Sequence, residues 1–242
     1  MTFFMRFWTS VVSALCFPLH LMYAVGFYEI YKRIFPICLY RLSIKYNEKM
    51  HDKKKELFRS LPEFNKPGGQ LTLLEIGCGT GTNFQFYPRG CKVICTDPNP
   101  HFQKYLQSSV VQNEHLKFEG FVVATGEDLG SVGAESVDVV VCTLVLCTVN
   151  DIAQTLREAH RVLRPGGAFF FIEHVVADPS TWAYFFQHIL QPAWWYFGDG
   201  CEATRETWKY LETAGFSDLK LRHIEAPLAF IIKPHILGYA VK

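Results

Sequence analysis

Three glycines at alternate positions, Gly77, Gly79 and Gly81, follow an apolar run of strand length that begins at Leu71. Because glycine has no Cβ, these residues can adopt a positive φ and let the backbone approach a bound ligand closely. A helix-like segment follows, and the free N–H groups of its first turn would face the same ligand. The pattern therefore predicts a nucleotide-binding turn.

The spacing of the glycines discriminates between classes of nucleotide. Dinucleotide-binding proteins use G-x-G-x-x-G/A, but counting from Gly77 the last position of that pattern is Thr82. A second apolar run, 92–96, ends in Asp97, about 20 residues beyond the turn, where a ribose-binding carboxylate is expected. The alternative, a glycine-rich turn without a ligand, does not account for this carboxylate.

The sequence Glu-x-Gly-x-Gly-x-Gly, which begins at Glu75, resembles motif I of the class I S-adenosylmethionine (SAM)-dependent methyltransferases. The resemblance implies that SAM is the co-substrate and that the carboxylate of Glu75 lies near its amino-acid end. It assigns the following residues to the SAM site: Glu75, Gly77, Gly79, Thr80, Gly81 and Asp97.

The chain departs from the family pattern after the third predicted strand, 117–123. Related methyltransferases often have Asp-Ala-Glu-Asp-Leu there, and the first acid accepts a hydrogen bond from the adenine amino group. This chain has Thr-Gly-Glu-Asp-Leu from Thr125. The adenine contact is therefore assigned to Thr125, to backbone amides at Gly126 or to Glu127, with a solvated loop as the alternative for Glu127. Cys142, where the fourth predicted strand ends, is also assigned to the SAM site.

Strand-like and helix-like segments alternate from Leu71 to Glu173. This alternation predicts an α/β fold with an open, mostly parallel, doubly wound sheet. The run from Val137 to Gly167 resembles the ubiquinone-biosynthesis-type branch of class I methyltransferases, which implies a Rossmann-like, seven-stranded sheet with an antiparallel last strand. The predicted strands are 71–76, 92–97, 117–123, 136–142 and 168–173, and the predicted helices are 45–61, 83–87, a segment from Pro100, and 151–163.

Charge and cysteine spacing do not favour a nucleic-acid partner or a metal site. The net charge of +1 gives no electrostatic footprint for nucleic acid, so no nucleic-acid partner is expected. The eight cysteines form neither a CxxC pair nor a Cys/His zinc spacing, so no metal is expected. Several cysteines lie in apolar runs, which indicates reduced, buried thiols in a protein that faces the cytosol.

The N-terminal segment from Phe7 to Tyr28 is almost wholly apolar, and His20 is its only ionisable side chain. A helix of this length can cross a hydrocarbon core of about 30 Å, so the segment predicts a membrane anchor. A cleaved signal peptide is the alternative, but no small-residue cleavage site is evident. Basic residues follow the segment, among them Lys32 and Arg33, and this bias places the main domain on the cytosolic side.

Proline leaves the form of the anchor open. Pro18 lies inside the apolar segment and Pro36 inside a second apolar patch. Because proline bends a helix, a hairpin in one leaflet is an alternative to a spanning helix. The predicted organisation is therefore a hydrophobic anchor with its juxtamembrane segment over residues 1–44 and a SAM-dependent methyltransferase domain over residues 45–242.

Aromatic residues crowd the segment 182–197 before Asp199 and Cys201. Such rings often form core, but this position is where the fold inserts substrate lids. With the N-terminal anchor, the run 142–147 and the end of the chain, this segment looks like the membrane-associated alkyl thiol S-methyltransferases of the endoplasmic reticulum and lipid droplets. The resemblance implies a small hydrophobic thiol as substrate, membrane lipid as partner, and location on the endoplasmic reticulum membrane and lipid droplets.

Transfer of a methyl group to a thiol requires little acid–base machinery, because proximity and alignment lower most of the barrier. His174, at the carboxyl end of the fifth predicted strand, is the first candidate to accept the thiol proton, since its pKa suits a general base. Asp199 is the second candidate. The alternatives are a structural histidine and a turn or cap aspartate, and Cys201 is expected to line the pocket.

Three other functions remain open. A lipid or quinone methyltransferase would use the same anchor and aromatic pocket. An adenine-N6 RNA methyltransferase would carry Asn/Asp-Pro-Pro-Tyr/Phe after the fourth strand, where this chain has Cys142-Thr143-Leu144-Val145. A non-catalytic membrane adaptor would tend to lose Glu75, the glycines or Asp97, and all are present. The identity of the thiol and the oligomeric state are not determined by the sequence.

Overall fold

A seven-stranded sheet forms the centre of the computed structural model, which describes residues 2–66 and 68–242. The strand order is β3-β2-β1-β4-β5-β7-β6, and β7 runs antiparallel to both of its neighbours while the other pairs are parallel. The predicted mostly parallel sheet with an antiparallel last strand is confirmed. The strands are β1 (Thr72–Ile76), β2 (Lys92–Thr96), β3 (Lys117–Val122), β4 (Val137–Thr143), β5 (Leu163–His174), β6 (Asp218–Glu225) and β7 (Pro234–Val241).

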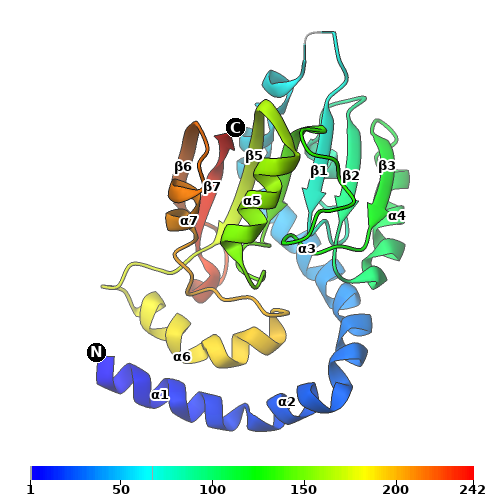
Figure 1. Ribbon diagram of the computed structural model, residues 1–242. Coiled ribbons are helices and arrows are strands. Elements are labelled where there is room, and N and C mark those ends of the chain that lie inside the picture. The colour runs from blue at the N-terminus through cyan, green and yellow to red at the C-terminus, as the bar shows by residue number, and fades with distance from the viewer. Residues whose placement is uncertain (1, 67) are drawn as a thin grey trace.

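Helices cover both faces of the sheet and one of its ends (Figure 1). Beyond the carboxyl end of the parallel strands, α1 and α6 lie side by side. The α-helices are α1 (Thr2–Leu15), α2 (Phe17–Met22), α3 (Tyr28–Phe58), α4 (Gln103–Gln112), α5 (Ile152–Val162), α6 (Trp182–Phe197) and α7 (Thr207–Thr213). Shorter helical turns are η1 (Tyr23–Phe27), η2 (Leu61–Phe64), η3 (Phe84–Phe86), η4 (Pro100–Phe102) and η5 (Phe230–Ile232).

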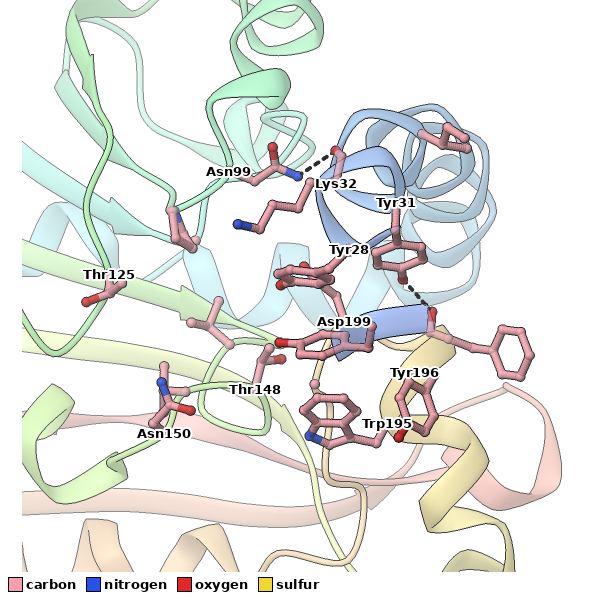
Figure 2. A pocket seen from close by; sticks show the side chains of 18 of the residues that line it. Tyr28, Tyr31, Lys32, Asn99, Thr125, Thr148, Asn150, Trp195, Tyr196 and Asp199 are labelled. Atoms are coloured by element: carbon pink, nitrogen blue, oxygen red, sulfur yellow. Dashed lines mark hydrogen bonds between the residues drawn. The ribbon is translucent and has the colours of Figure 1, made fainter. Parts of the chain in front are cut away.

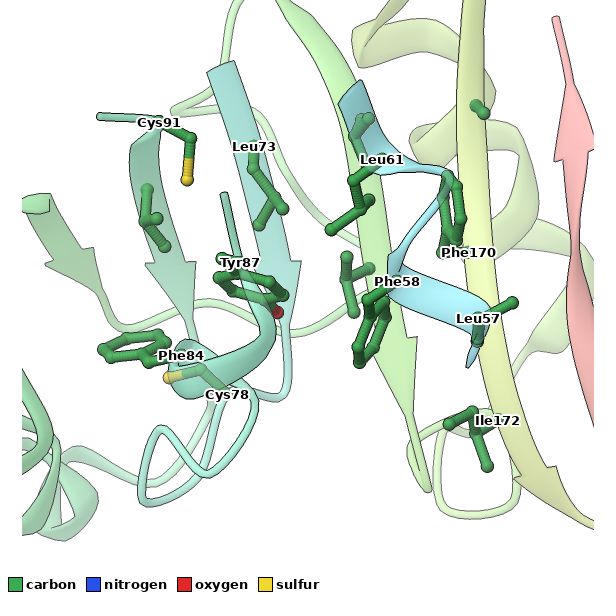
Figure 3. Close-up of a cluster of buried hydrophobic side chains, with 14 of the residues drawn as sticks. Leu57, Phe58, Leu61, Leu73, Cys78, Phe84, Tyr87, Cys91, Phe170 and Ile172 are labelled. Atoms are coloured by element: carbon green, nitrogen blue, oxygen red, sulfur yellow. The ribbon is translucent and has the colours of Figure 1, made fainter. Parts of the chain in front are cut away.

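Alternate residues of the central strands enter two hydrophobic clusters. Leu73 and Phe170 pack with Phe58 of α3 on one face (Figure 3), whereas Leu74 and Phe171 pack with α5 and α7 on the other. Because both faces are covered, β4 and β5 are almost continuously apolar, as is typical of buried parallel strands. This rigid core holds the carboxyl ends of β1, β2, β4 and β5 at one edge.

The apolar N-terminal segment is not one straight helix. It breaks at Cys16 and again at Gly26, whose φ of 94° is one that other residues rarely adopt. Among residues 2–66 and 68–242 no single helix is long and apolar enough to cross a membrane, although one bent pair, Phe3–Leu15 with Phe17–Phe64 at 48°, passes that test of length and composition. The anchor therefore stays a prediction.

The helix expected over 45–61 is longer than its pattern indicated. It is the end of α3, which runs without interruption from Tyr28 to Phe58 and includes Pro36. The helix tolerates this proline because the carbonyl of Lys32, four residues earlier, accepts a hydrogen bond from Asn99 Nδ2 at 2.9 Å instead. A similar contact occurs in α6, where Pro192 cannot donate to the carbonyl of His188; the Thr9 hydroxyl lies 3.2 Å from this carbonyl and shares its one proton with the Met5 carbonyl at 2.9 Å. Two helix prolines thus dock distant segments onto each other.

Candidate active site

A cavity of about 560 Å³ opens at the carboxyl end of the sheet, beside the glycine turn (Figure 2). One wall consists of Gly77, Thr125 and Glu127 from loops that follow the strands. The opposite wall consists of aromatic side chains from the N-terminal segment and from the end of α6. These are Tyr23, Phe27, Tyr28, Tyr31, Trp195, Tyr196 and Phe197. Clefts at this edge are where open α/β sheets bind their ligands.

The glycine turn fits a closely approaching ligand. Gly77, Gly79 and Gly81 all have a positive φ, at 62°, 50° and 74°. A Cβ on Gly77 would lie 2.3 Å from a methyl carbon of Val145, so no larger residue fits there without displacement. Asp97 supports the turn from β2, because its carboxylate accepts hydrogen bonds from the N–H groups of Gly79 at 3.0 Å and Asn99 at 2.9 Å.

Asp97 lies directly behind the cavity wall, of which its neighbours Pro98 and Asn99 form part. Burial raises the pKa of Asp97 to about 7, although the two backbone N–H groups oppose this shift, and the charge of Asp199 adds to it. A ribose hydroxyl that donated to this carboxylate would stabilise its ionised form. Without such a donor, the Asp97 carboxyl changes charge near neutral pH.

A buried hydrogen-bond network lies beneath the turn and ties it to α3. The Lys54 ammonium donates to the side-chain oxygens of Asn47 at 2.6 Å and Asn83 at 2.7 Å. Asn83 in turn donates to Glu75 at 2.7 Å, and Tyr87 donates to the other Glu75 oxygen at 2.8 Å. Burial raises the pKa of Glu75 to about 7 and lowers that of Lys54 to about 7. Lys54 was not singled out from the sequence, since a lysine in a charged helix usually faces solvent.

Thr80 and Gly81 contact the neighbouring helices. The Thr80 hydroxyl lies 3.3 Å from that of Ser43 in α3, and its carbonyl accepts from the Ser109 hydroxyl of α4 at 2.6 Å. A Cβ on Gly81 would meet α4 at Leu106 and Ser109 at 3.0 Å. These two residues hold the turn against α3 and α4.

The loop after β3 forms the adenine side of the predicted site. Thr125, Gly126 and Glu127 line the cavity. The Glu127 carboxylate is not free, because it accepts from the backbone N–H groups of Asn150 at 2.7 Å and Asp151 at 3.3 Å. Glu127 therefore also fixes the start of α5, a role that the local sequence pattern did not reveal.

Asp199 lies in the cavity on the aromatic wall. Its φ of 53° places it in the left-handed region, which turns the carboxylate toward Tyr28, whose hydroxyl donates to it at 3.0 Å. Burial raises the pKa of Asp199, while the Tyr28 hydrogen bond and the charge of Lys32 oppose this. Tyr31 donates to the carbonyl of Phe197 at 3.1 Å, which joins α3 to the end of α6.

The structure separates the other predicted residues from the cavity surface. In the part of the chain that is described, the following predicted residues do not line the cavity: Glu75, Gly79, Thr80, Gly81, Cys142, His174 and Cys201, which was expected to line the pocket. The Cys142 thiol is buried and donates to Glu173 at 3.5 Å. His174 lies at the end of β5 with its Nδ1 3.6 Å from the Cys201 sulfur. Of the predicted residues, Gly77, Gly126, Glu127 and Asp199 come together around the cavity, and Asp97 lies immediately behind it.

Sequence reasoning missed the tyrosines of the N-terminal segment. Tyr23, Tyr28 and Tyr31 lie in a stretch that we interpreted only as a membrane anchor, yet all three line the cavity. A signal was present in the residue types. A purely lipid-facing helix gains little from these hydroxyls, whereas a cavity wall can give them partners, as Asp199 does for Tyr28 and the carbonyl of Phe197 does for Tyr31.

Comparisons with known proteins agree with this geometry. Residues 74–171 match the family model described as a methyltransferase domain. The chain is 59% identical to human thiol S-methyltransferase TMT1A over 87% of each chain, and 49% identical to human thiol S-methyltransferase TMT1B over 96% of each chain. The chain belongs to the thiol S-methyltransferase family. The predicted SAM-dependent class I methyltransferase is thereby confirmed.

Solved structures show the same fold at low sequence identity. A SAM-dependent methyltransferase from Thermotoga maritima, titled a possible histamine N-methyltransferase, superimposes with a TM-score of 0.61 at 18% identity, over 89% of this chain and 99% of that one. A geranyl diphosphate methyltransferase in complex with its diphosphate and sinefungin gives 0.58 at 16% identity, over 79% of this chain and 77% of that one. For the chain described here, SAM is the co-substrate.

Proposed function

We propose that the chain transfers a methyl group from SAM to the sulfur of small, apolar alkyl thiols at a membrane surface. The observation that carries this proposal is the division of the cavity into a cofactor wall at the glycine turn and an aromatic wall with one carboxylate. The relatives named thiol S-methyltransferases support the acceptor class. An apolar wall favours greasy thiols over charged ones, whose carboxylates would need partners once desolvated.

The chain supplies alignment and a proton acceptor. The SAM sulfonium supplies an activated methyl group, and the thiol sulfur displaces it in line. A thiol with a pKa of about 8.5 is only partly ionised near neutrality. Asp199, which lies in the cavity, is the group that we assign to accept the S–H proton and pass it to solvent. His174, the first candidate from the sequence, becomes the second here, because it does not line the cavity in the described structure and its Nδ1 lies 3.6 Å from the Cys201 sulfur.

Asp199→Asn tests this assignment. The variant retains the size of the side chain and its contact with Tyr28 but cannot accept a proton. We expect kcat with a small alkyl thiol to fall about 10²- to 10⁴-fold near neutrality, the usual range for a lost acid–base group, and to recover partly at high pH, where the thiol ionises unaided. A loss that is equal at every pH would show that Asp199 only positions the acceptor.

The acceptor class is tested with purified full-length protein and labelled SAM. A graded series of alkyl thiols is compared with glutathione, a phosphatidylethanolamine and a quinol in one buffer. Thioether formation that increases with chain length and exceeds that of glutathione supports the proposal. Methylation of the lipid or the quinol, without any of the thiols, contradicts it.

The proposed location is the cytosolic face of the endoplasmic reticulum membrane and of lipid droplets. Apolar side chains on α1 and α2 support it, since Phe3 is 85%, Leu15 74% and Phe17 63% exposed. Trp182 and Phe197, at the two ends of the adjacent α6, are 71% and 67% exposed. Exposed apolar patches of this kind mark interaction surfaces, and membrane lipid is the proposed partner.

Surface substitutions test the location without opening the cavity. Phe3→Ser, Leu15→Ser and Phe17→Ser together remove exposed apolar side chains, and of these residues none lines the cavity within the described chain. We expect the triple variant to float poorly with phosphatidylcholine vesicles while keeping its affinity for SAM. Unchanged flotation would place the membrane contact elsewhere.

A further inference from the structure

Two thiols and an imidazole from three distant segments meet below the cavity floor. Cys147 follows β4, His174 ends β5, and Cys201 lies between α6 and α7. The two sulfurs are 3.2 Å apart, and the Cys201 sulfur is 3.6 Å from His174 Nδ1. All three side chains are buried, and one ligand atom of each lies within 4.8 Å of the others. The proposed transfer of the thiol proton to Asp199 uses neither of these two thiols.

We propose that Cys147, His174 and Cys201 bind a Zn²⁺ ion. Cysteine sulfur and histidine nitrogen are preferred zinc ligands, at about 2.3 Å and 2.0–2.1 Å. In a tetrahedral site these bonds place neighbouring ligand atoms roughly 3.5–3.8 Å apart. The separation of 3.6 Å between Cys201 and His174 already fits, and the sulfurs would open by about half an ångström from 3.2 Å.

Charge balance supports a divalent ion at this depth. Two thiolates neutralise Zn²⁺, so the completed site buries no net charge, and the imidazole contributes as a neutral ligand. The nearest carboxylate, Glu173, is already engaged, because it accepts from the backbone N–H groups of Val145 at 3.0 Å and Cys147 at 3.4 Å. Glu173 thereby fixes the loop that carries Cys147.

His235 provides an independent observation beside the cluster. Its ring lies 4.6 Å from that of His174, centroid to centroid. Its Nδ1 donates to the carbonyl of Lys233 at 3.2 Å, which leaves Nε2 as an unprotonated nitrogen, and this buried atom has no hydrogen-bond partner among the described residues. A histidine whose other nitrogen is held by a backbone carbonyl has the arrangement typical of metal ligands. This unpartnered nitrogen belongs to a ring that packs edge-on against the ring of His174, one of the three ligands.

A bound ion would fix the position of two segments that line the cavity. Cys147 and Cys201 are next to Thr148 and Gly200, which line the cavity. Zinc would therefore join the β4 loop, the end of β5 and the α6–α7 connection in one cross-link. This inference does not depend on which molecule accepts the methyl group, because the cluster lies beside the cavity whatever substrate binds there.

Metal content of the purified full-length protein tests the proposal. We expect about one equivalent of zinc by mass spectrometry of the metal, and loss of at least about 100-fold in zinc affinity in Cys147→Ser, His174→Ala and Cys201→Ser, because each removes a direct ligand. Cys91→Ala, which removes a buried thiol on another part of the sheet, is the matched control and should keep the zinc.

Cobalt replacement keeps the test informative if the variants fold poorly. Wild-type protein loaded with Co²⁺ should show thiolate-to-metal charge-transfer absorption and the visible bands of a tetrahedral site, and Zn²⁺ should abolish both. A chelator should lower Tm in the wild type but leave Tm unchanged in Cys201→Ser. Folded wild-type protein with no stoichiometric zinc and no cobalt spectrum would overturn the proposal, as would a stable Cys147–Cys201 disulfide, seen as a loss of two hydrogens, in freshly purified protein.

Discussion

The two walls of the cavity are held in different ways. The wall at the glycine turn is fixed by backbone conformation and by the buried Lys54–Glu75 network. The opposite wall consists of tyrosine and tryptophan side chains on helices joined by a few hydrogen bonds, such as that from Tyr28 to Asp199. A rigid wall suits one invariant co-substrate, whereas an aromatic wall can accept apolar molecules of several shapes.

If the wall at the glycine turn depends on backbone conformation, Gly77→Ala should lower the affinity for SAM more than the other substitutions do. A left-handed φ costs a non-glycine residue about 1–2 kcal/mol, and the added Cβ would lie 2.3 Å from Val145. We expect the affinity for SAM to fall at least about 100-fold, because a displaced turn misaligns every contact with the ligand. Calorimetric titration measures this. Gly120→Ala is the control, since a Cβ there meets open space.

Asp97→Asn should have the next largest effect. It removes a charged acceptor for the ribose, worth about 1.5–3 kcal/mol, so SAM should bind about 10- to 100-fold more weakly. Because the pKa of Asp97 is raised to about 7, wild-type affinity for SAM should increase from pH 6 to pH 8 as the carboxyl ionises. That increase should be smaller in the variant, and equal pH profiles would exclude Asp97 as the acceptor.

Ionisation of Asp97 has opposite effects on two quantities. As the pH rises, it increases the affinity for SAM but lowers the free energy of unfolding of the ligand-free protein. Asp97 has a pKa of about 7 in the folded protein and 3.8 as its ordinary value. Its contribution to the free energy of unfolding is therefore fully present below pH 3.8 and is lost as the pH rises through about 7. Thermal unfolding of the wild type and Asp97→Asn from pH 4 to pH 8, each with and without SAM, separates the two effects.

Lys54→Met distinguishes support of the first wall from direct contact with SAM. The variant keeps the length of the side chain but leaves the Asn47 and Asn83 oxygens without their donor. We expect the free energy of unfolding to fall by about 1–3 kcal/mol, the cost of an unsatisfied buried group. Denaturant titration measures this loss. Lys55→Met, one residue later and exposed, should unfold like the wild type.

Tyr28→Phe should cause the smallest loss, and it should affect only the use of the thiol at the aromatic wall. It removes the hydroxyl that donates to Asp199 but keeps the ring. We expect kcat/KM for an alkyl thiol to fall by about tenfold or less, the value of one charge-assisted hydrogen bond, with SAM affinity unchanged. Steady-state kinetics with Tyr40→Phe as control measures this, since Tyr40 does not line the cavity in the described structure. An equal loss of SAM affinity would mean that the walls are not separate.

The sequence predicted the sheet because its signals are local. Strands such as 136–142 are almost continuously apolar, and glycine spacing with Asp97 placed the SAM turn without tertiary information. It could not predict the second wall. The turn at Gly26 and the approach of Tyr28 to Asp199, 171 residues away, depend on long-range packing that leaves no periodic pattern. The burial of Lys54 also depends on long-range packing, so no periodic pattern in the sequence predicts it.

The pairing of α1 with α6 sets the order in which the molecule can be completed during synthesis. Thr9 is made 179 residues before His188, whose carbonyl lies 3.2 Å from its hydroxyl. At about 5–20 residues per second, the ribosome exposes the aromatic N-terminal helices for roughly ten to thirty seconds before α6 exists. During that interval the apolar side chains of α1 lack the helix against which they pack in the finished molecule.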